Sequence, residues 1–230
     1  MRYKEMDSRL DRAIYRSAYH IYKPLAHLAF GLQTAGRENI PSEGPAIIAS
    51  NHRTMLDTLA LPAAVRDRHV TMLARDDLSS NGAFQWLLRH LEVIQIGRHD
   101  FSTDDLRLIN ARLKAGRLIG IYPEETRGNR QLRKIDRAAN LGEFKPGVAS
   151  FARRHNVTTI PAAVSGLDNP WQEGQRRIAR VAFGEPIEPP AVGPAAKREF
   201  LEHLRYEIQG LYEANLTEIS QSLTNQPFTS

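Results

Sequence analysis

Short apolar runs alternate with helix-like segments along this 230-residue chain, and this alternation limits the fold more than any other feature. Six such runs are five to eight residues long, as buried strands are, and turns or amphipathic stretches separate them. The runs are residues 46–50, 70–74, 92–96, 118–122, 157–164 and 178–183. Strands separated by helical segments predict an α/β fold, with a central mostly parallel or mixed sheet flanked by helices.

Prolines and alternation refine three of these elements. Residues 6–30 have helical periodicity, and Pro24 should kink or restart that helix. Pro161 lies inside the fifth apolar run and should restrict its pairing, because proline has no N–H to donate. The sixth run, 178–183, alternates between apolar and polar residues and therefore indicates an edge or half-exposed strand.

The chain divides into three parts. Residues 1–35 combine apolar residues at helical spacing with basic residues and tyrosines, which predicts an amphipathic helix on a membrane surface. Packing of that helix on its own domain is the alternative interpretation. Residues 36–190 hold the strands and form the predicted main domain. A proline-rich stretch then leads into a predicted C-terminal helix and tail, residues 191–230.

Composition excludes several classes of protein. The chain has no cysteine, so disulfides, cysteine zinc sites and thiol nucleophiles are excluded. No stretch approaches the 18 or so apolar residues of a membrane span. The net charge of +5 is concentrated in two segments, residues 1–37 and 126–147, each of which carries +4. Two basic segments indicate an anionic partner such as phosphate head groups, nucleic acid or an acidic carrier protein.

Asn51 and His52 directly follow the first buried run, at the edge where α/β sheets bind their ligands. Asp57 lies five positions after His52, and on one helix the two side chains would diverge by about 140°. They can meet only if His52 lies in the loop and Asp57 in the first helical turn. The carboxylate would then fix the ring tautomer and leave the other nitrogen as a general base. A solvent-exposed histidine beside a helix N-terminal aspartate is the alternative.

Further polar residues follow later strands. Arg98 comes after one predicted strand, and Tyr122-Pro123-Glu124-Glu125-Thr126-Arg127 after another. Lys145 lies in Phe144-Lys145-Pro146-Gly147, ahead of a helical stretch. If these strand ends share one edge of the sheet, a base would face a cationic pocket suited to phosphate.

Taken in order, these blocks resemble the glycerolipid acyltransferase family, which includes bacterial 1-acylglycerol-3-phosphate acyltransferases. The likeness spans residues 36–190. It rests on Asn51-His52 with Asp57, Ile94 to Arg98, Tyr122 to Arg127, Phe144 to Gly147, Thr159-Ile160-Pro161 and Phe183 to Ile187. The resemblance implies a transferase that moves a fatty acyl group from acyl-CoA or acyl carrier protein to a lysophospholipid hydroxyl.

By the same resemblance, His52 is the general base and Asp57 orients it, with no metal, no cofactor and no covalent acyl-enzyme. The implied substrate-binding residues are Asn51, Arg98, Glu124, Glu125, Thr126, Arg127, Lys145 and Gly147. Among them, the two arginines and Lys145 hold the acceptor phosphate, and Glu124 with Thr126 shapes the acceptor pocket. The implied location is cytoplasmic, peripheral on the inner face of the cell membrane. The sequence does not indicate an oligomeric state.

One position departs from the family pattern. Glu125 stands where the family normally has glycine, and its negative charge would repel a phosphate. An acceptor without a phosphate, such as another hydroxylated lipid, is therefore the alternative substrate.

Two other classes of function compete with acyl transfer. A hydrolase is disfavoured because the chain lacks a Gly-x-Ser-x-Gly motif. A non-catalytic lipid-binding module remains open. Nucleic-acid binding is not expected, since no aromatic residue interrupts the basic run 127–137.

Overall fold

The computed structural model describes residues 9–65, 68–75, 93–96, 102–124, 141–168 and 178–224. Its strands are β1 (Gln33–Ala35), β2 (Ala46–Ser50), β3 (Val70–Arg75), β4 (Ile94–Ile96), β5 (Leu118–Ile121), β6 (Thr159–Ser165) and β7 (Arg180–Phe183). Its helices are α1 (Arg9–Phe30), the 3-10 helix η1 (Arg37–Asn39), α2 (Asp57–Ala64), α4 (Thr103–Lys114), α5 (Gly147–His155) and α6 (Pro194–Thr224).

All seven strands form one sheet in the order β1-β7-β6-β2-β5-β3-β4. Every neighbouring pair is parallel except β6 and β7, which are antiparallel. The prediction of a mostly parallel or mixed sheet flanked by helices is therefore confirmed. Strand β2 lies in the middle between β5 and β6, and all five of its residues are buried.

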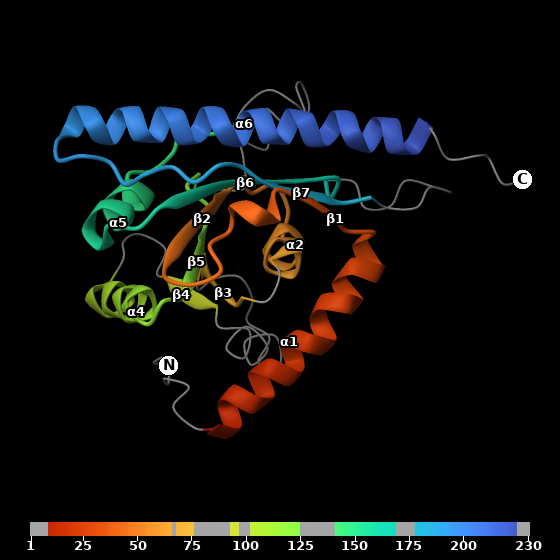
Figure 1. Cartoon of the computed structure of the whole chain (residues 1–230), viewed down its shortest axis with the longest axis horizontal. Helices are drawn as coiled ribbons and strands as arrows, with labels where there is room; N and C mark the ends of the chain where they lie inside the picture. Colours follow the sequence, from red (N-terminus) through yellow and green to blue (C-terminus); the bar gives the residue numbers. More distant parts are fainter. Residues whose placement is uncertain are drawn as a thin grey trace, which may run out of the picture.

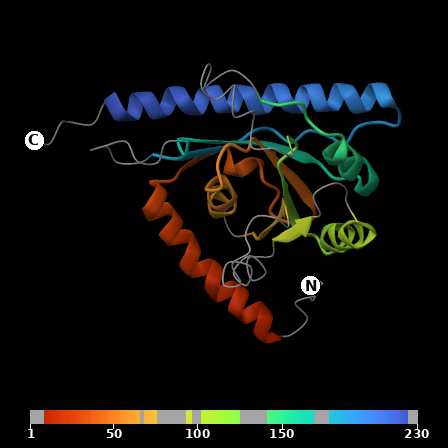
Figure 2. The same cartoon turned by 180° about the vertical axis from the view of Figure 1, so that it is seen from behind.

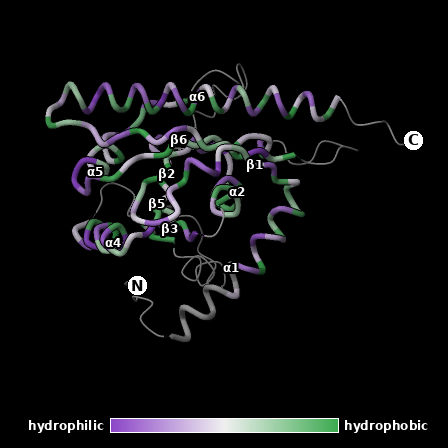
Figure 3. Tube along the Cα trace, viewed as in Figure 1, coloured by the Kyte–Doolittle hydropathy of each residue, from purple (hydrophilic) through white to green (hydrophobic). Residues whose placement is uncertain are grey.

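The alternation of side chains along β2 separates two hydrophobic layers. Ala46 and Ile48 pack with residues of α1 and α2, whereas Ile47 and Ala49 pack with residues of α4, α5 and α6. The long helix α6 accordingly covers one face of the sheet, while α1 and α2 lie on the other (Figures 1 and 2). Hydrophobic residues gather on the strands and on α2 (Figure 3). Both faces of β2 are thus covered, as a continuous apolar strand requires.

Helix α1 runs through Pro24 without a break, so the expected restart at this proline is wrong. Pro24 is exposed, and its ring removes a single hydrogen bond from the solvent side of the helix. The opposite side is fixed to α2, because the Tyr22 hydroxyl donates to the Leu59 carbonyl and the Lys23 amine to the Val65 carbonyl. Contacts on the buried side hold the helix together where the proline weakens it.

Strand β7 is not an edge strand, and that expectation is wrong as well. The three-residue strand β1 pairs with β7 in parallel and covers its outer side. Pro161 stands in register with Ala49 of β2, and the ladder between β6 and β7 begins one residue later, at Ala162. Beyond that point the Pro161 carbonyl accepts a hydrogen bond from the Gly184 N–H at 2.8 Å. In the described part of the chain, no helix is both long enough and apolar enough to cross a membrane.

Candidate active site

His52 and Asp57 meet at the corner between β2 and α2. The strand ends at Ser50 and the helix begins at Asp57, so His52 lies in the loop as predicted. Its Nδ1 lies 3.4 Å from Asp57 Oδ2, with the His52 side chain 13% exposed and Asp57 2% exposed. This separation is an electrostatic contact, and Nδ1 makes no hydrogen bond within the described chain. Such contacts are often long before substrate binds.

The Asp57 carboxylate is anchored by the loop that precedes it. Its Oδ2 accepts hydrogen bonds from the backbone N–H groups of Arg53 and Thr54, both at 2.7 Å. Its Oδ1 accepts from the Thr54 hydroxyl at 3.1 Å. The carboxylate therefore holds a fixed position beside the imidazole, which suits a group that orients a base.

Asn51 ties the same loop to the neighbouring strand. Its side-chain nitrogen donates to the Val164 carbonyl at 2.9 Å, and its oxygen accepts from the Val164 N–H at 2.8 Å. Asn51 is fully buried. Both polar atoms of the amide bond to the backbone of β6. The Asn51 side chain therefore fixes the end of β2, directly before His52.

Glu124 contacts the backbone of His52. Its carboxylate is nearly buried, at 4% exposure, and lies just after β5. Oε1 accepts from the His52 N–H at 3.3 Å, and Oε2 accepts from the Gly142 N–H at 2.8 Å. Burial raises the pKa of Glu124, while the hydrogen bonds from Gly142 and His52 partly oppose that rise.

Tyr122 is a site residue that the sequence analysis quoted only as part of a block. Its ring stacks on the His52 imidazole, with 4.3 Å between centroids and 22° between planes. Its hydroxyl is buried and has no hydrogen-bond partner among the described residues, and burial raises its pKa. The signal for Tyr122 was its place two residues before Glu124 at the end of a strand.

The long helix α6 also reaches the site. The Arg53 guanidinium lies 4.9 Å from the centroid of the Tyr212 ring, and the Tyr212 hydroxyl donates to Asp168 Oδ2 at 3.3 Å. No local sequence pattern could connect Tyr212 with Arg53, because 159 positions separate them.

The remaining predicted residues fall into two groups. Lys145 is exposed, and its N–H donates to the Pro123 carbonyl at 2.8 Å, which brings the Lys145 backbone beside the turn that carries Glu124. Gly147 is the first residue of α5. The second group, Arg98, Glu125, Thr126 and Arg127, lies outside the described residues.

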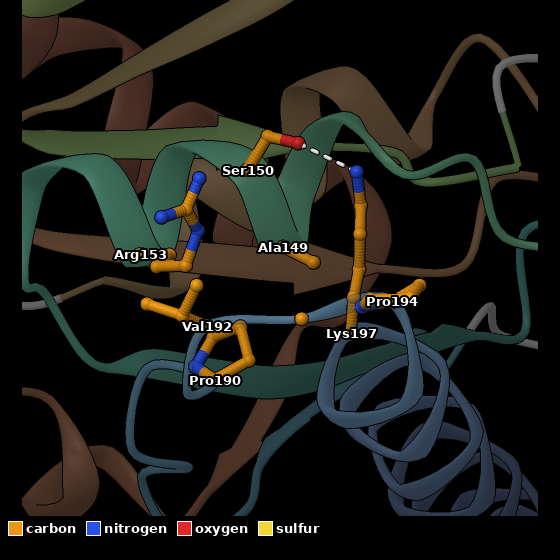
Figure 4. A pocket seen from close by; sticks show the side chains of 8 residues that line it. Ala149, Ser150, Arg153, Pro190, Val192, Pro194 and Lys197 are labelled. Atoms are coloured by element: carbon orange, nitrogen blue, oxygen red, sulfur yellow. Dashed lines mark hydrogen bonds between the residues drawn. The ribbon is translucent and has the colours of Figure 1, made fainter.

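A separate pocket of about 180 Å³ lies between α5 and the start of α6 (Figure 4). Lys197 and Arg153 enter it from the two helices, and the Lys197 amine donates to the Ser150 hydroxyl at 2.9 Å. Lys197 precedes Tyr212 by about 22 Å along α6, given the helical rise per residue. The pocket is therefore remote from His52, and it does not take part in the chemistry derived below.

The fold and the site together define an α/β protein that carries a His–Asp pair at one edge of its sheet. A family model described as Acyltransferase matches residues 31–165, which is more than half of the chain. The protein belongs to the acyltransferase family, and the resemblance drawn from the sequence blocks is confirmed.

Individual relatives agree with this placement. The chain is 20% identical to a 1-acyl-sn-glycerol-3-phosphate acyltransferase of Bacillus subtilis over 174 residues, which is 76% of this chain and 82% of that protein. It is 25% identical to a chloroplastic enzyme of the same name from Arabidopsis thaliana, covering 74% of this chain but 45% of the relative. The crystal structure of the 1-acyl-sn-glycerophosphate acyltransferase from Thermotoga maritima has a TM-score of 0.66 at 18% identity, covering 90% of this chain and 84% of that one. This last likeness shows a shared fold.

Proposed function

We propose that this protein transfers a fatty acyl group from a thioester donor to the hydroxyl of a lysophospholipid-like acceptor, with 1-acylglycerol-3-phosphate as the acceptor. The observation that carries the proposal is the His52–Asp57 pair, held at the corner between β2 and α2 with its carboxylate fixed by three hydrogen bonds. The names of the relatives from Bacillus subtilis and Arabidopsis thaliana support the choice of acceptor.

The proposed reaction is a direct acyl transfer. The free ring nitrogen of His52 takes the proton from the acceptor hydroxyl while the oxygen attacks the thioester carbonyl. The tetrahedral intermediate then expels the thiolate, which takes the proton back from His52 and leaves as a thiol. Asp57 lies 3.4 Å from Nδ1, where its negative charge stabilises the imidazolium between these two steps. The step needs neither a cofactor nor a covalent acyl-enzyme.

The acceptor phosphate is assigned to Lys145 together with Arg98 and Arg127. The exposure of Lys145 and the contact of its backbone with Pro123 support this assignment, because they place a cation near the turn after β5. Acyl-CoA and acyl carrier protein are both anionic donors, and the +4 charge of residues 126–147 suits either.

The protein is proposed to act at the inner face of the cell membrane, where its acceptor and product reside. Three apolar side chains on α1 support this location, since Ile21, Leu25 and Leu28 are 62%, 57% and 76% exposed. Their spacings of four and three residues put them on one side of the helix, opposite the side that contacts α2. We call this surface the outer face of α1.

The proposal is tested with purified protein, acyl-CoA or acyl carrier protein, and a panel of lysolipid acceptors. His52→Ala should lower kcat by roughly 100-fold to 10,000-fold, because it removes the general base. Products identified by mass give the acceptor directly. Acceptor binding without turnover in the wild-type protein would instead support a non-catalytic lipid-binding module.

A second candidate, acylation of an acceptor without phosphate, is favoured by Glu125 in place of the family glycine. Glu125→Gly should then increase the affinity for phosphorylated acceptors, since it removes a repelling charge. Unchanged acceptor preference in Glu125→Gly would remove the reason for this candidate.

A further inference from the structure

We propose that Glu124 is a positioning residue, which fixes the backbone of His52 and the segment 141–147 and does not bind the acceptor. This inference rests on the proposed function, because it concerns how the proposed general base is held. It also replaces the expectation from the family resemblance that Glu124 shapes the acceptor pocket.

The two carboxylate oxygens of Glu124 already serve two backbone amides. One accepts from His52 and the other from Gly142, and the side chain is 4% exposed. A carboxylate that contacted the acceptor would need an accessible oxygen, whereas the Glu124 side chain is almost entirely covered. The partly buried N–H of His52 needs an acceptor in any case, since a donor that is shielded from water and left unpaired destabilises the fold.

Glu124 joins two segments that are distant in sequence. His52 lies 72 positions before it and Gly142 lies 18 positions after it. The Lys145 N–H adds a second link between the segment that contains Gly142 and the turn after β5, since it donates to the Pro123 carbonyl at 2.8 Å. The turn after β5 therefore holds the His52 loop on one side and the segment leading to α5 on the other.

The close approach of Gly142 supports the same reading. A Cβ added at Gly142 would lie 3.2 Å from Oε2 of Glu124, which is tighter than an ordinary contact. Gly142→Ala should therefore push on the carboxylate without a clash elsewhere, since the three nearest atoms to that Cβ all belong to Glu124. The contact between Glu124 and Gly142 can therefore be disturbed by a substitution at either residue.

A positioning role and an acceptor-binding role of Glu124 predict different changes in kcat and KM. Glu124→Gln keeps one acceptor oxygen and turns the other into a donor that faces an N–H. The positioning role predicts a kcat lower by roughly 10-fold to 100-fold, as for the partners that orient ligands in other sites, with the acceptor KM within about twofold. Glu143→Gln is the matched control, because Glu143 is the exposed neighbour of Gly142, and it should change neither parameter.

Two further measurements distinguish the positioning role of Glu124 from a general loss of stability. Hydrogen exchange at the amides of His52 and Gly142 should accelerate in Glu124→Gln, while amides in the middle of β6 stay protected. The double variant Glu124→Gln with Gly142→Ala should have a kcat close to that of the more impaired single variant, since both disturb one contact.

A raised acceptor KM with an unchanged kcat in Glu124→Gln would overturn the inference, as would unchanged exchange at both amides. Failure of the proposed function has a different signature, because there the wild-type protein transfers no acyl group and His52→Ala changes nothing. Even then, the exchange measurement reports whether Glu124 holds the two backbone segments.

Discussion

The imidazole of His52 stacks on a tyrosine ring whose hydroxyl is buried without a hydrogen-bond partner in the described chain. The ring of Tyr122 therefore supports the imidazole, whereas its hydroxyl makes no interaction among the described residues that would stabilise the folded protein.

Tyr122→Phe should retain the stacking contact and remove an unsatisfied polar group. We expect its free energy of unfolding to rise by about 1 kcal/mol, measured by urea denaturation, with kcat within about twofold of wild type. Tyr122→Leu is the comparison, because it loses the flat ring and should lower kcat. A large loss of activity in Tyr122→Phe would mean that the hydroxyl takes part in the reaction.

Glu124 makes a prediction about pH. Burial raises its pKa in the folded protein above that in the unfolded chain. The folded state therefore holds this proton more tightly, so the stability that the group contributes is complete below the unfolded pKa and is lost as the pH rises through the folded pKa. As the pH falls from neutral to mildly acidic, the free energy of unfolding of the wild-type protein should therefore rise relative to that of Glu124→Gln. Denaturation at several pH values would contradict this if the difference between the two proteins stayed constant.

At the scale of elements, local patterns predicted what local interactions decide. The start of α4 is decided locally in this way, since Ser102 forms a capping box with Asp105, three residues further on. Strand β2 was predicted with its observed bounds, because a short continuous apolar run is typical of a strand that is buried on both faces. The three-residue strand β1 was missed, since it is held by pairing with β7 and carries no pattern of its own.

The outer face of α1 gives a prediction at this scale. Leu25→Ser with Leu28→Ser should weaken binding to anionic vesicles by roughly 100-fold or more in a flotation assay, since each leucine that inserts into the lipid contributes about 1.5–3 kcal/mol. The free energy of unfolding should hardly change, because both side chains are already exposed.

Tyr206→Ser is the matched control for this experiment. Tyr206 is 76% exposed on α6, which covers the other face of the sheet. If Tyr206→Ser weakened vesicle binding as much as the α1 variant, the outer face of α1 would have no special role.

At the scale of the whole molecule, the candidate site joins residues from most of the chain. His52 and Asp57 were predictable because a strand, a loop and a helix start lie within twelve residues of one another. Glu124 was predictable as a site residue, although its partners were not. Its contact with His52 depends on β2 and β5 lying side by side, which no local pattern specifies. The contact of Tyr212 with Arg53 depends in the same way on where α6 crosses the sheet.

The order of the strands also has a practical consequence for anyone who shortens this gene. The segment that matches the family model ends at residue 165, before β7 and α6. A protein truncated there would leave β1 with no strand beside it, because its sheet neighbour is β7. It would also expose the apolar side of the sheet that Phe200, Leu204 and Ile208 cover. The smallest soluble product that keeps the catalytic corner should therefore extend at least through Asn215, whose amide holds the β6 and β7 carbonyls of Ala163 and Arg180.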